Sequence, residues 1–149
     1  MNELDIKILT LLQKNSRISI SEMSAQVNLS ISATSDRLRK LESSGIISQY
    51  TAILNPEVFN KTLMAIMFVS LENPNFTDMF LAFVHDQEEI LECHYLAGNF
   101  DYALKIVTKN TASLEAILYK IKSVTGIQKT ETNVVLSTVK NQYSILPTN

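Results

Sequence analysis

The feature that most constrains the fold is a change in the spacing of apolar residues along the chain. Residues 3–44 carry apolar side chains only at helical spacing, whereas residues 63–139 alternate extended apolar runs with helical stretches. We therefore predict two domains joined near Asn55 and Pro56. The predicted division is a helical domain over residues 1–50, a linker strand or loop over residues 51–62 and a second domain over residues 63–149.

The first domain is predicted to contain three short helices. The first should end near Lys14, and Ser19 with Glu22 has the capping-box spacing that starts a second helix. Asn28 tolerates the left-handed conformation that a tight turn requires, and Ser30 is a natural N-cap for a third helix. The residues expected to face the core are Leu4, Ile8, Leu11, Leu12, Met23, Val27, Ile31, Thr34, Leu38 and Leu41.

The outer face of the third helix has the composition of a helix that reads the DNA major groove. Small side chains at its start allow close approach to base edges, and cations in its later turns can reach phosphates. A helix of this kind can equally be an ordinary solvated face. The outer residues are Ser32, Ala33, Ser35, Asp36, Arg37, Arg39 and Lys40. Gly45 should end the helix, and residues 45–55 are expected to form a strand or β-ribbon, which makes a winged helix-turn-helix.

The second domain is predicted to be a ferredoxin-like βαββαβ unit, which makes the whole chain an α+β protein. Residues 63–71 form an apolar run typical of a strand buried on both faces, and Asn75 can cap the helix that follows. Residues 91–97 and 102–107 alternate as the two strands of a hairpin around Gly98 and Asn99. The remaining elements are a helix through Leu114, Ile117, Leu118 and Ile121, a break at Gly126 and a strand over residues 127–139.

Charge and hydropathy exclude several classes of protein. The net charge is −2, so a DNA-binding role must depend on a local patch; residues 1–50 carry six basic and five acidic side chains. No apolar run approaches the ~18 residues of a membrane span. Acidic residues near Met1 do not resemble a signal peptide, so we expect a cytoplasmic protein.

The sequence contains no recognisable catalytic or metal-binding constellation. His85 and His94 have no further ligand at metal-binding spacing, and we expect neither a metal nor a cofactor. Cys93 adjoins His94, but neighbours on a strand point to opposite faces and cannot form a nucleophile–base pair. Cys93 is therefore expected to be a small core residue, and the chain is not expected to be an enzyme.

Several segments, in this order and spacing, resemble the Lrp/AsnC (feast/famine) family of transcription regulators. Those of the first domain are Leu4-Asp5-Ile6-Lys7-Ile8-Leu9, Leu12-Gln13-Lys14-Asn15-Ser16-Arg17-Ile18-Ser19, Leu29-Ser30, Arg37-Leu38-Arg39-Lys40-Leu41-Glu42 and Gly45-Ile46-Ile47. In the second domain, Ala97-Gly98-Asn99-Phe100-Asp101-Tyr102 resembles the family's Gly-x-x-Asp-Tyr turn. The resemblance covers nearly the whole chain.

The resemblance implies double-stranded DNA, a small effector and further copies of the chain as partners. The effector would be an amino acid bound between subunits, and homodimers would assemble into a larger oligomer such as an octamer. The implied DNA-binding residues are Ser30, Ser32, Ala33, Ser35, Asp36, Arg37, Arg39 and Lys40, with a structural role as the alternative for Arg37. The implied effector residues are Gly98, Asn99, Asp101, Tyr102, Thr130 and Thr132.

Other interpretations remain beside this one. Gly98 and Asn99 suit any hairpin, a tyrosine on a strand usually serves packing, and Asp36 would repel phosphate unless it accepts a hydrogen bond from cytosine. An architectural DNA-binding oligomer without an effector would share the same helices. A metabolic enzyme or carrier with a helical docking head is disfavoured by the missing acid–base and metal groups.

Overall fold

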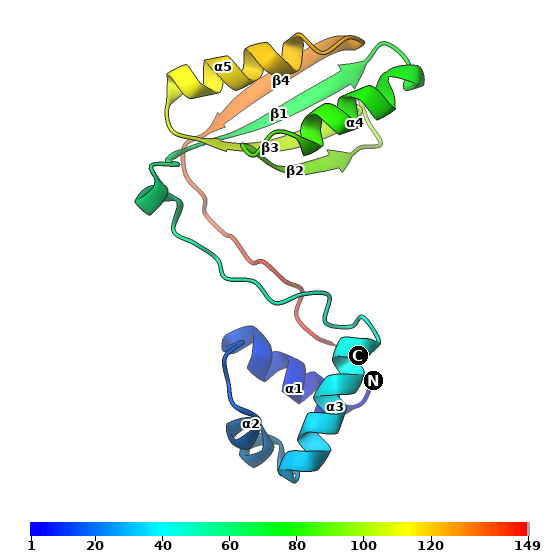
Figure 1. The fold of residues 1–149 in the computed structure, drawn as a ribbon, viewed down its shortest axis with the longest axis vertical. Helices are drawn as coiled ribbons and strands as arrows, with labels where there is room; N and C mark the ends of the chain where they lie inside the picture. Colours follow the sequence, from blue (N-terminus) through cyan, green and yellow to red (C-terminus); the bar gives the residue numbers. More distant parts are fainter. Residues whose placement is uncertain (149) are drawn as a thin grey trace. The chain divides into compact units, whose positions relative to one another are not determined.

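The computed structural model describes residues 1–148, which form two compact units (Figure 1). Residues 1–53 and 140–148 make the N-terminal unit, and Leu54–Val139 makes the C-terminal unit. Within the described residues, no helix is both long and apolar enough to cross a lipid bilayer.

The N-terminal unit contains the three predicted helices, α1 (Glu3–Lys14), α2 (Ile20–Val27) and α3 (Ile31–Ser43). The Ser19 hydroxyl accepts from the Glu22 backbone N–H while the Glu22 carboxylate accepts from the Ser19 N–H, which confirms the predicted capping box. Each helix contributes to a small core of buried apolar side chains, and this packing holds the unit together. These core residues are Ile8, Met23, Val27 and Leu41.

The turn between α2 and α3 has the predicted geometry. Asn28 is left-handed, with φ 55° and ψ 47°, and Ser30 caps α3 by accepting from the Ala33 N–H at 3.2 Å. Leu29 is partly buried and packs on the core below the turn. A short polar residue at position 28 therefore performs the turn that glycine would otherwise make.

Two predictions for the N-terminal unit were wrong. Ile31 was expected on the core face but is 57% exposed, because it occupies the first turn of α3, beyond the reach of α1 and α2. Residues 45–55 form no strand in the part of the chain that the structure describes. A strand requires a hydrogen-bonding neighbour, and within residues 1–148 this segment pairs with no other strand.

The C-terminal unit is a four-stranded antiparallel sheet in the order β2-β3-β1-β4, as the ferredoxin-like prediction requires (Figure 1). Its strands are β1 (Leu63–Leu71), β2 (Ile90–Tyr95), β3 (Tyr102–Thr108) and β4 (Ile127–Val135). Its helices are α4 (Thr77–His85) and α5 (Thr111–Lys122), and two short 3₁₀ turns lie at Pro56–Phe59 and Pro74–Phe76.

The alternation of buried and partly buried residues along β1 shows that the core lies on only one face of the sheet. Ala65, Met67 and Val69 of β1 are fully buried and pack with side chains from α4 and α5. The alternate residues Met64, Ile66 and Phe68 are only partly buried, so the prediction of a strand buried on both faces was wrong. Both helices cover the same face, and no other helix of the C-terminal unit, as described over residues 54–139, is available to cover the opposite one.

Three boundaries in the C-terminal unit also differ from the predictions. Asn75 does not cap α4; instead the Asn73 side chain accepts from the Asn75 N–H and starts a 3₁₀ turn. The last strand ends at Val135, where its pairing with Met64 of β1 ends, rather than at residue 139. The second strand, expected over residues 91–97, is β2, Ile90–Tyr95.

Residues 140–148 of the C-terminal tail group with the N-terminal unit. The Gln13 side-chain amide donates to the Ser144 hydroxyl at 3.1 Å and to the Ile145 carbonyl. Nothing in the spacing of residues 140–148 signals this contact, which joins positions more than a hundred residues apart.

Candidate nucleic-acid interface and effector turn

The outward face of α3 is a narrow stripe of polar residues. At 100° per residue, Ser32, Asp36 and Arg39 lie opposite the buried Thr34 and Leu41, and all three lie on the solvent side. Thr34 is held inward because its hydroxyl donates to the Ser30 carbonyl at 2.9 Å. The stripe is therefore fixed in its direction by the core side of the same helix.

The first turn of α3 presents only small side chains on this side. The Ser30 and Ser32 hydroxyls are hydrogen-bonded at 3.1 Å, and Ala33 and Ser35 are half-buried on the two flanks of the stripe. Small groups here let a helix backbone approach base edges closely. The structure thus brings Ser32, Ala33 and Ser35, the residues expected nearest to the bases, to the same turn as the Ser30 cap.

Arg37 points away from the polar stripe and binds α1. Its Nη1 lies 2.8 Å from Asp5 Oδ1 and also donates to the Asn2 side-chain oxygen at 3.3 Å. Hydrogen bonding from the Asn2 backbone, and then from the Arg37 guanidinium, holds the pKa of Asp5 below its usual value. These contacts favour the structural alternative for Arg37.

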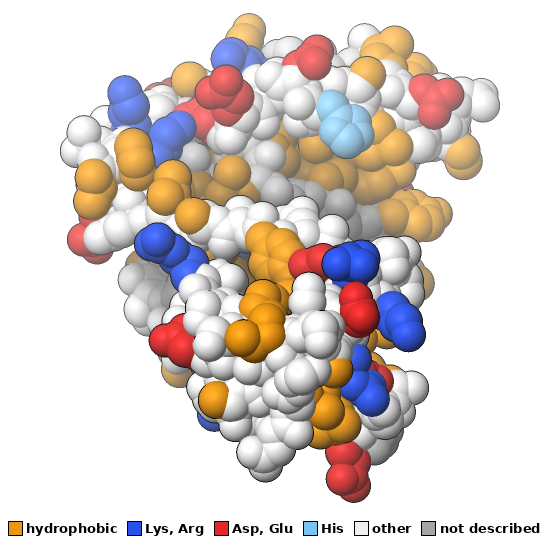
Figure 2. Space-filling model, turned by 60° about the horizontal axis from the view of Figure 1, so that its bottom comes forward, with side chains coloured by type: hydrophobic (Ala, Val, Ile, Leu, Met, Phe, Trp, Pro, Cys, Tyr) orange, Lys and Arg blue, Asp and Glu red, His pale blue; other side chains and the backbone are white. Residues whose placement is uncertain are grey.

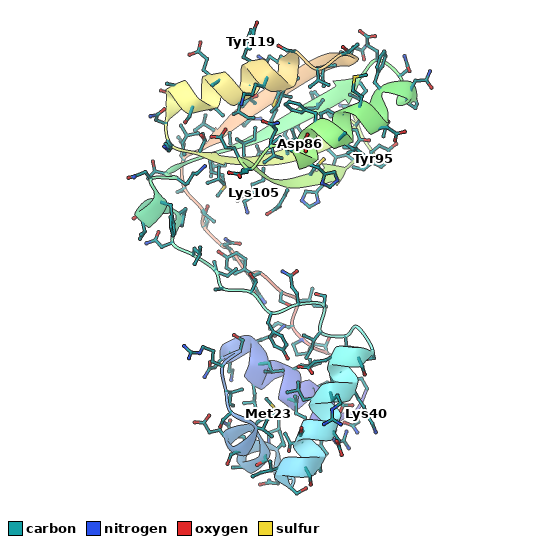
Figure 3. All side chains as sticks on the ribbon, viewed as in Figure 1. Met23, Lys40, Asp86, Tyr95, Lys105 and Tyr119 are labelled. Carbon is teal, nitrogen blue, oxygen red and sulfur yellow. The ribbon has the colours of Figure 1, made fainter. Side chains whose placement is uncertain are left out.

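Arg39 and Lys40 are the other two cations of α3. Arg39 Nη1 lies 3.4 Å from Asp36 Oδ1, and both side chains are largely exposed, so solvent screens this pair. Lys40 lies on the side of α3 shown in Figure 3 and lines an open depression with Asp36 and Arg37. On the face of the N-terminal unit shown in Figure 2, basic and acidic side chains lie interspersed rather than in one basic patch.

A further contact at the end of α3 was not predicted. The Tyr50 hydroxyl donates to Glu42 Oε1 at 2.9 Å and fastens the chain that leaves the helix. Burial of the ring, followed by this hydrogen bond to Glu42, raises the pKa of Tyr50 to about 12. The two residues are eight positions apart, and Tyr50 lies beyond the end of α3. Helical spacing therefore could not predict this contact.

In the C-terminal unit, the turn between β2 and β3 is fastened to the end of β1. Asp101 makes most of this contact: its N–H donates to the Val69 carbonyl at 2.9 Å, and its Oδ2 accepts from the Leu71 N–H at 2.7 Å. Ser70 Oγ donates to the Asn99 carbonyl at 3.4 Å. The Asp101 carboxylate therefore orders the turn through Oδ2.

Tyr102 is a core residue. Only 5% of it is exposed, and its ring packs against Phe80 at 4.9 Å and Tyr95 at 5.3 Å between centroids. This environment favours the packing alternative for Tyr102. Gly98 lies in open space, since an added Cβ would meet nothing within 4 Å.

Thr130 and Thr132 lie on β4, opposite Val69 and Met67 of β1. Residues that pair across strands share a face, so both threonines lie on the helix-covered side. Val69 also pairs with Tyr102, which places Thr130 and Tyr102 on either side of the same β1 residue. Thr132 lies two residues further along β4 and is more distant from the turn.

Three residues near the turn form a cluster that the sequence analysis missed. On the open face of the sheet, the Phe100 ring lies 5.6 Å from the Phe68 ring, and Lys129 Nζ lies 4.9 Å from the Phe100 centroid. An ammonium above an aromatic pair can attract a carboxylate while the rings contact an apolar group. The signal available in the sequence was Phe68, an alternate residue of the first strand.

The C-terminal unit shows no arrangement suited to nucleophilic catalysis at its cysteine. Cys93 is half-buried against the core, and burial raises the pKa of its thiol, which disfavours the reactive thiolate. Among residues 1–148, no group of three His, Cys, Asp or Glu side chains is arranged to hold a metal ion.

Comparison with known proteins matches both units. Residues 64–145 match the Lrp/AsnC ligand binding domain, and residues 1–48 match a winged helix-turn-helix DNA-binding family. The leucine-responsive regulatory protein of Haemophilus influenzae is 36% identical over 143 residues, which cover 94% of this chain and 86% of that protein.

Solved structures share the whole fold. A transcriptional regulator from Neisseria meningitidis, in complex with L-methionine, superposes with a TM-score of 0.92 at 35% identity and covers 97% of this chain and 96% of its own. A feast or famine regulatory protein from M. tuberculosis, complexed with L-methionine, gives a TM-score of 0.88 at 27% identity and covers 98% and 99%. These proteins are regulators, and the resemblance seen in the sequence is confirmed.

Proposed function

Because this chain belongs to the Lrp/AsnC family of DNA-binding transcriptional regulators, we propose that an amino acid bound between its subunits modulates its assembly and DNA affinity. The observation that carries the proposal is the polar stripe on α3, with small groups at its start and solvent-facing cations near its end. The C-terminal unit supplies the effector turn and an uncovered sheet face.

In the proposed interface, Ser30, Ser32, Ala33 and Ser35 lie nearest to the bases. Arg39 and Lys40 contact phosphates, and Asp36 restrains Arg39 until DNA competes for the guanidinium. Arg37 positions α3 through Asp5 rather than touching DNA. In this division, the start of α3 recognises the DNA sequence, and its later turns supply affinity for the phosphate backbone.

We propose an α-amino acid with an apolar side chain as the effector. Two structural neighbours hold L-methionine, and the Lys129, Phe100 and Phe68 cluster lies beside the Asp101 turn. The ammonium group would pair with Asp101, and the Gly98 and Asn99 backbone would receive the carboxylate. Thr130 lies at the same end of the sheet on its helix-covered face, and from that face it supports the site together with Thr132 and Tyr102.

The effector would act through assembly. The partly exposed apolar residues of β1, Met64, Ile66 and Phe68, lie on the uncovered sheet face and suit a homodimer, which can build a larger ring such as an octamer. A ligand between subunits shifts such an equilibrium only by its differential affinity for the two assemblies. An oligomer presents several α3 helices to DNA, and linked contacts raise the overall affinity through effective concentration. Each single helix can therefore bind weakly, as its modest basic charge suggests. A regulator of this kind would work in the cytoplasm, where it meets DNA.

The test is selection of bound duplexes from a random DNA pool, at fixed moderate salt, with and without a mixture of the twenty amino acids. Enrichment of a two-fold symmetric site, with an affinity that the mixture changes, supports the proposal. Equal enrichment in both arms contradicts the effector half. Tight binding without enrichment contradicts sequence-specific reading and favours an architectural DNA-binding oligomer.

A further inference from the structure

The two edges of the sheet differ in chemistry. β4, at one edge, carries Lys129 and Glu131, whose charges discourage pairing with another strand. β2, at the other edge, exposes Leu91 to 59% and Tyr95 to 78%. Exposed apolar groups on an edge strand can pair with another chain.

The backbone of β2 is oriented for such pairing. The Leu96 N–H donates to the Asp101 carbonyl at 2.7 Å, and the pairing register gives His94 and Glu92 the same orientation toward β3, as far as the irregularity between Ile90 and Glu92. The N–H and C=O groups of Cys93 and Tyr95 therefore point away from β3, toward the open edge. They can form a second ladder without breaking the first.

We propose that β2 pairs antiparallel with β2 of a second copy of this chain, about a two-fold axis at Cys93. In this register, Glu92 of each copy lies opposite His94 of the other, and Leu91 lies beside Tyr95 of the other. Charged and polar partners then share the open face, while apolar partners share the helix-covered face. The strand is thus complementary to itself.

Neighbouring registers lack this complementarity. An axis at Glu92 places two carboxylates directly opposite each other, and an axis at His94 places two imidazoles opposite each other. Like groups in cross-strand positions destabilise pairing. Within one chain, Glu92 Oε1 accepts from Lys105 Nζ at 2.8 Å, and Glu92 Oε2 lies 3.1 Å from His94 Nε2. In the paired strands, each His94 would exchange the Glu92 of its own chain for that of the second copy.

A hollow beside β2 can accept the apolar residues of the second copy. It has a volume of about 420 Å³, and its walls come from Thr77 and Leu81 of α4 and from Cys93, Tyr95 and Tyr102 of the sheet. An incoming Leu91 would contact Tyr95 and this hollow. The contact would extend the core of one C-terminal unit into the next.

This inference rests on the proposed self-assembly and names one surface of it. The test is oxidative crosslinking of the full chain, because Cys93 is its only cysteine. Added diamide takes up two electrons and two protons from two Cys93 thiols, and one S–S bond forms between copies. Residues directly opposite in a hydrogen-bonded antiparallel pair have Cα atoms about 5.5 Å apart, which a disulfide can span.

A collision control comes from Tyr119, an exposed residue of α5 (Figure 3). In a Cys93→Ala background, Tyr119→Cys should crosslink at least about tenfold more slowly than the mixed pair described next, because contact raises effective concentration. In the same background, Glu92→Cys mixed with His94→Cys should crosslink as heterodimers, whereas each variant alone should react slowly. The mixed pair reports the register itself.

The outcomes separate this inference from the proposed function. Rapid crosslinking at Cys93 and in the mixed pair supports the β2 contact. If light scattering shows an oligomer while the mixed Glu92→Cys and His94→Cys pair crosslinks no faster than the Tyr119→Cys control, assembly uses another surface and the inference is overturned. A chain that remains monomeric at all concentrations overturns both the inference and the proposed assembly, while the DNA selection still tests reading by α3.

Discussion

The guanidinium of Arg37 lies 2.8 Å from the carboxylate of Asp5, and this ion pair joins α3 to the first helix of the chain. The Asp5 side chain is 17% exposed and that of Arg37 is 32% exposed, so the pair is only partly screened by solvent. It fixes the direction of α3 from the side that faces away from the polar stripe.

Breaking this pair should lower stability. We expect a coupling free energy of about 1 kcal/mol between Arg37→Met and Asp5→Asn in a double-mutant cycle, measured by urea unfolding. Because the Asp5 pKa is lowered in the folded state, its contribution should be present above about pH 4 and lost as pH falls through the folded pKa. An Asp5→Asn variant whose acid sensitivity equals that of the wild type would contradict this.

DNA binding should depend on the later turns of α3 in a graded way. Arg39→Ala and Lys40→Ala should each flatten the plot of log affinity against log salt by about 0.9, one phosphate contact. Arg37→Met should leave this slope unchanged, because Arg37 contacts Asp5. Asp36→Asn should raise affinity for all sequences by removing a negative charge from the stripe. If all four variants keep the wild-type slope of log affinity against log salt, the cations of α3 do not contact phosphates.

Effector binding should depend on the charge of Asp101 separately from its role in the turn. In Asp101→Asn, the side-chain amide oxygen can still accept from the Leu71 N–H but cannot attract an ammonium group as a carboxylate does. Asp101→Asn should therefore weaken binding of L-methionine about tenfold in calorimetry, with a smaller loss of stability than Asp101→Ala. Unchanged affinity in Asp101→Asn would place the ammonium elsewhere.

Gly126 should not tolerate a side chain. It has φ +89°, and an added Cβ would lie 2.1 Å from Phe76 Cγ, so Gly126→Ala should cost about 2–4 kcal/mol of unfolding free energy. Gly98→Ala is the matched control, because nothing lies within 4 Å of its added Cβ. Its unfolding free energy should stay within about 0.5 kcal/mol of the wild type, measured in urea. Equal losses in both variants would show that the Phe76 contact is unimportant.

Tyr50 should titrate late and couple to unfolding at alkaline pH. Its folded pKa of about 12 exceeds the unfolded value, so its stabilising effect is present below about pH 10 and is lost as pH rises toward 12. Ultraviolet difference titration of wild type against Tyr50→Phe isolates this tyrosine from the others. Glu42→Gln should lower its pKa but leave part of the rise, because burial of the ring is the larger cause.

Local signals in the sequence predicted local structure well. The capping box at Ser19, the left-handed Asn28 and the Ser30 cap depend on neighbours within four positions, and all are present. The order of elements followed from periodicity in the same way. The failures involve long-range partners: within the described chain, residues 45–55 lie beside no strand, and the open face of β1 is covered by neither α4 nor α5.

The candidate sites show the same division. The residue types of the polar stripe were evident from helical spacing, but the engagement of Arg37 with Asp5 depends on how α1 packs on α3. Asp101 was recognised as a polar turn residue, whereas its bond to Leu71 depends on strand order. Phe68, Phe100 and Lys129 come from three separate segments, and only the folded sheet brings them together.

The Gln13 contact makes the DNA-binding unit discontinuous along the chain. The C-terminal unit is topologically an insertion between two segments of its neighbour, so the chain crosses between the units twice. Truncation after residue 139 would therefore shorten the N-terminal unit without touching any of its helices. Transplanting this DNA-binding unit onto another protein would require grafting two pieces, the helices and the tail, in place of a single contiguous module.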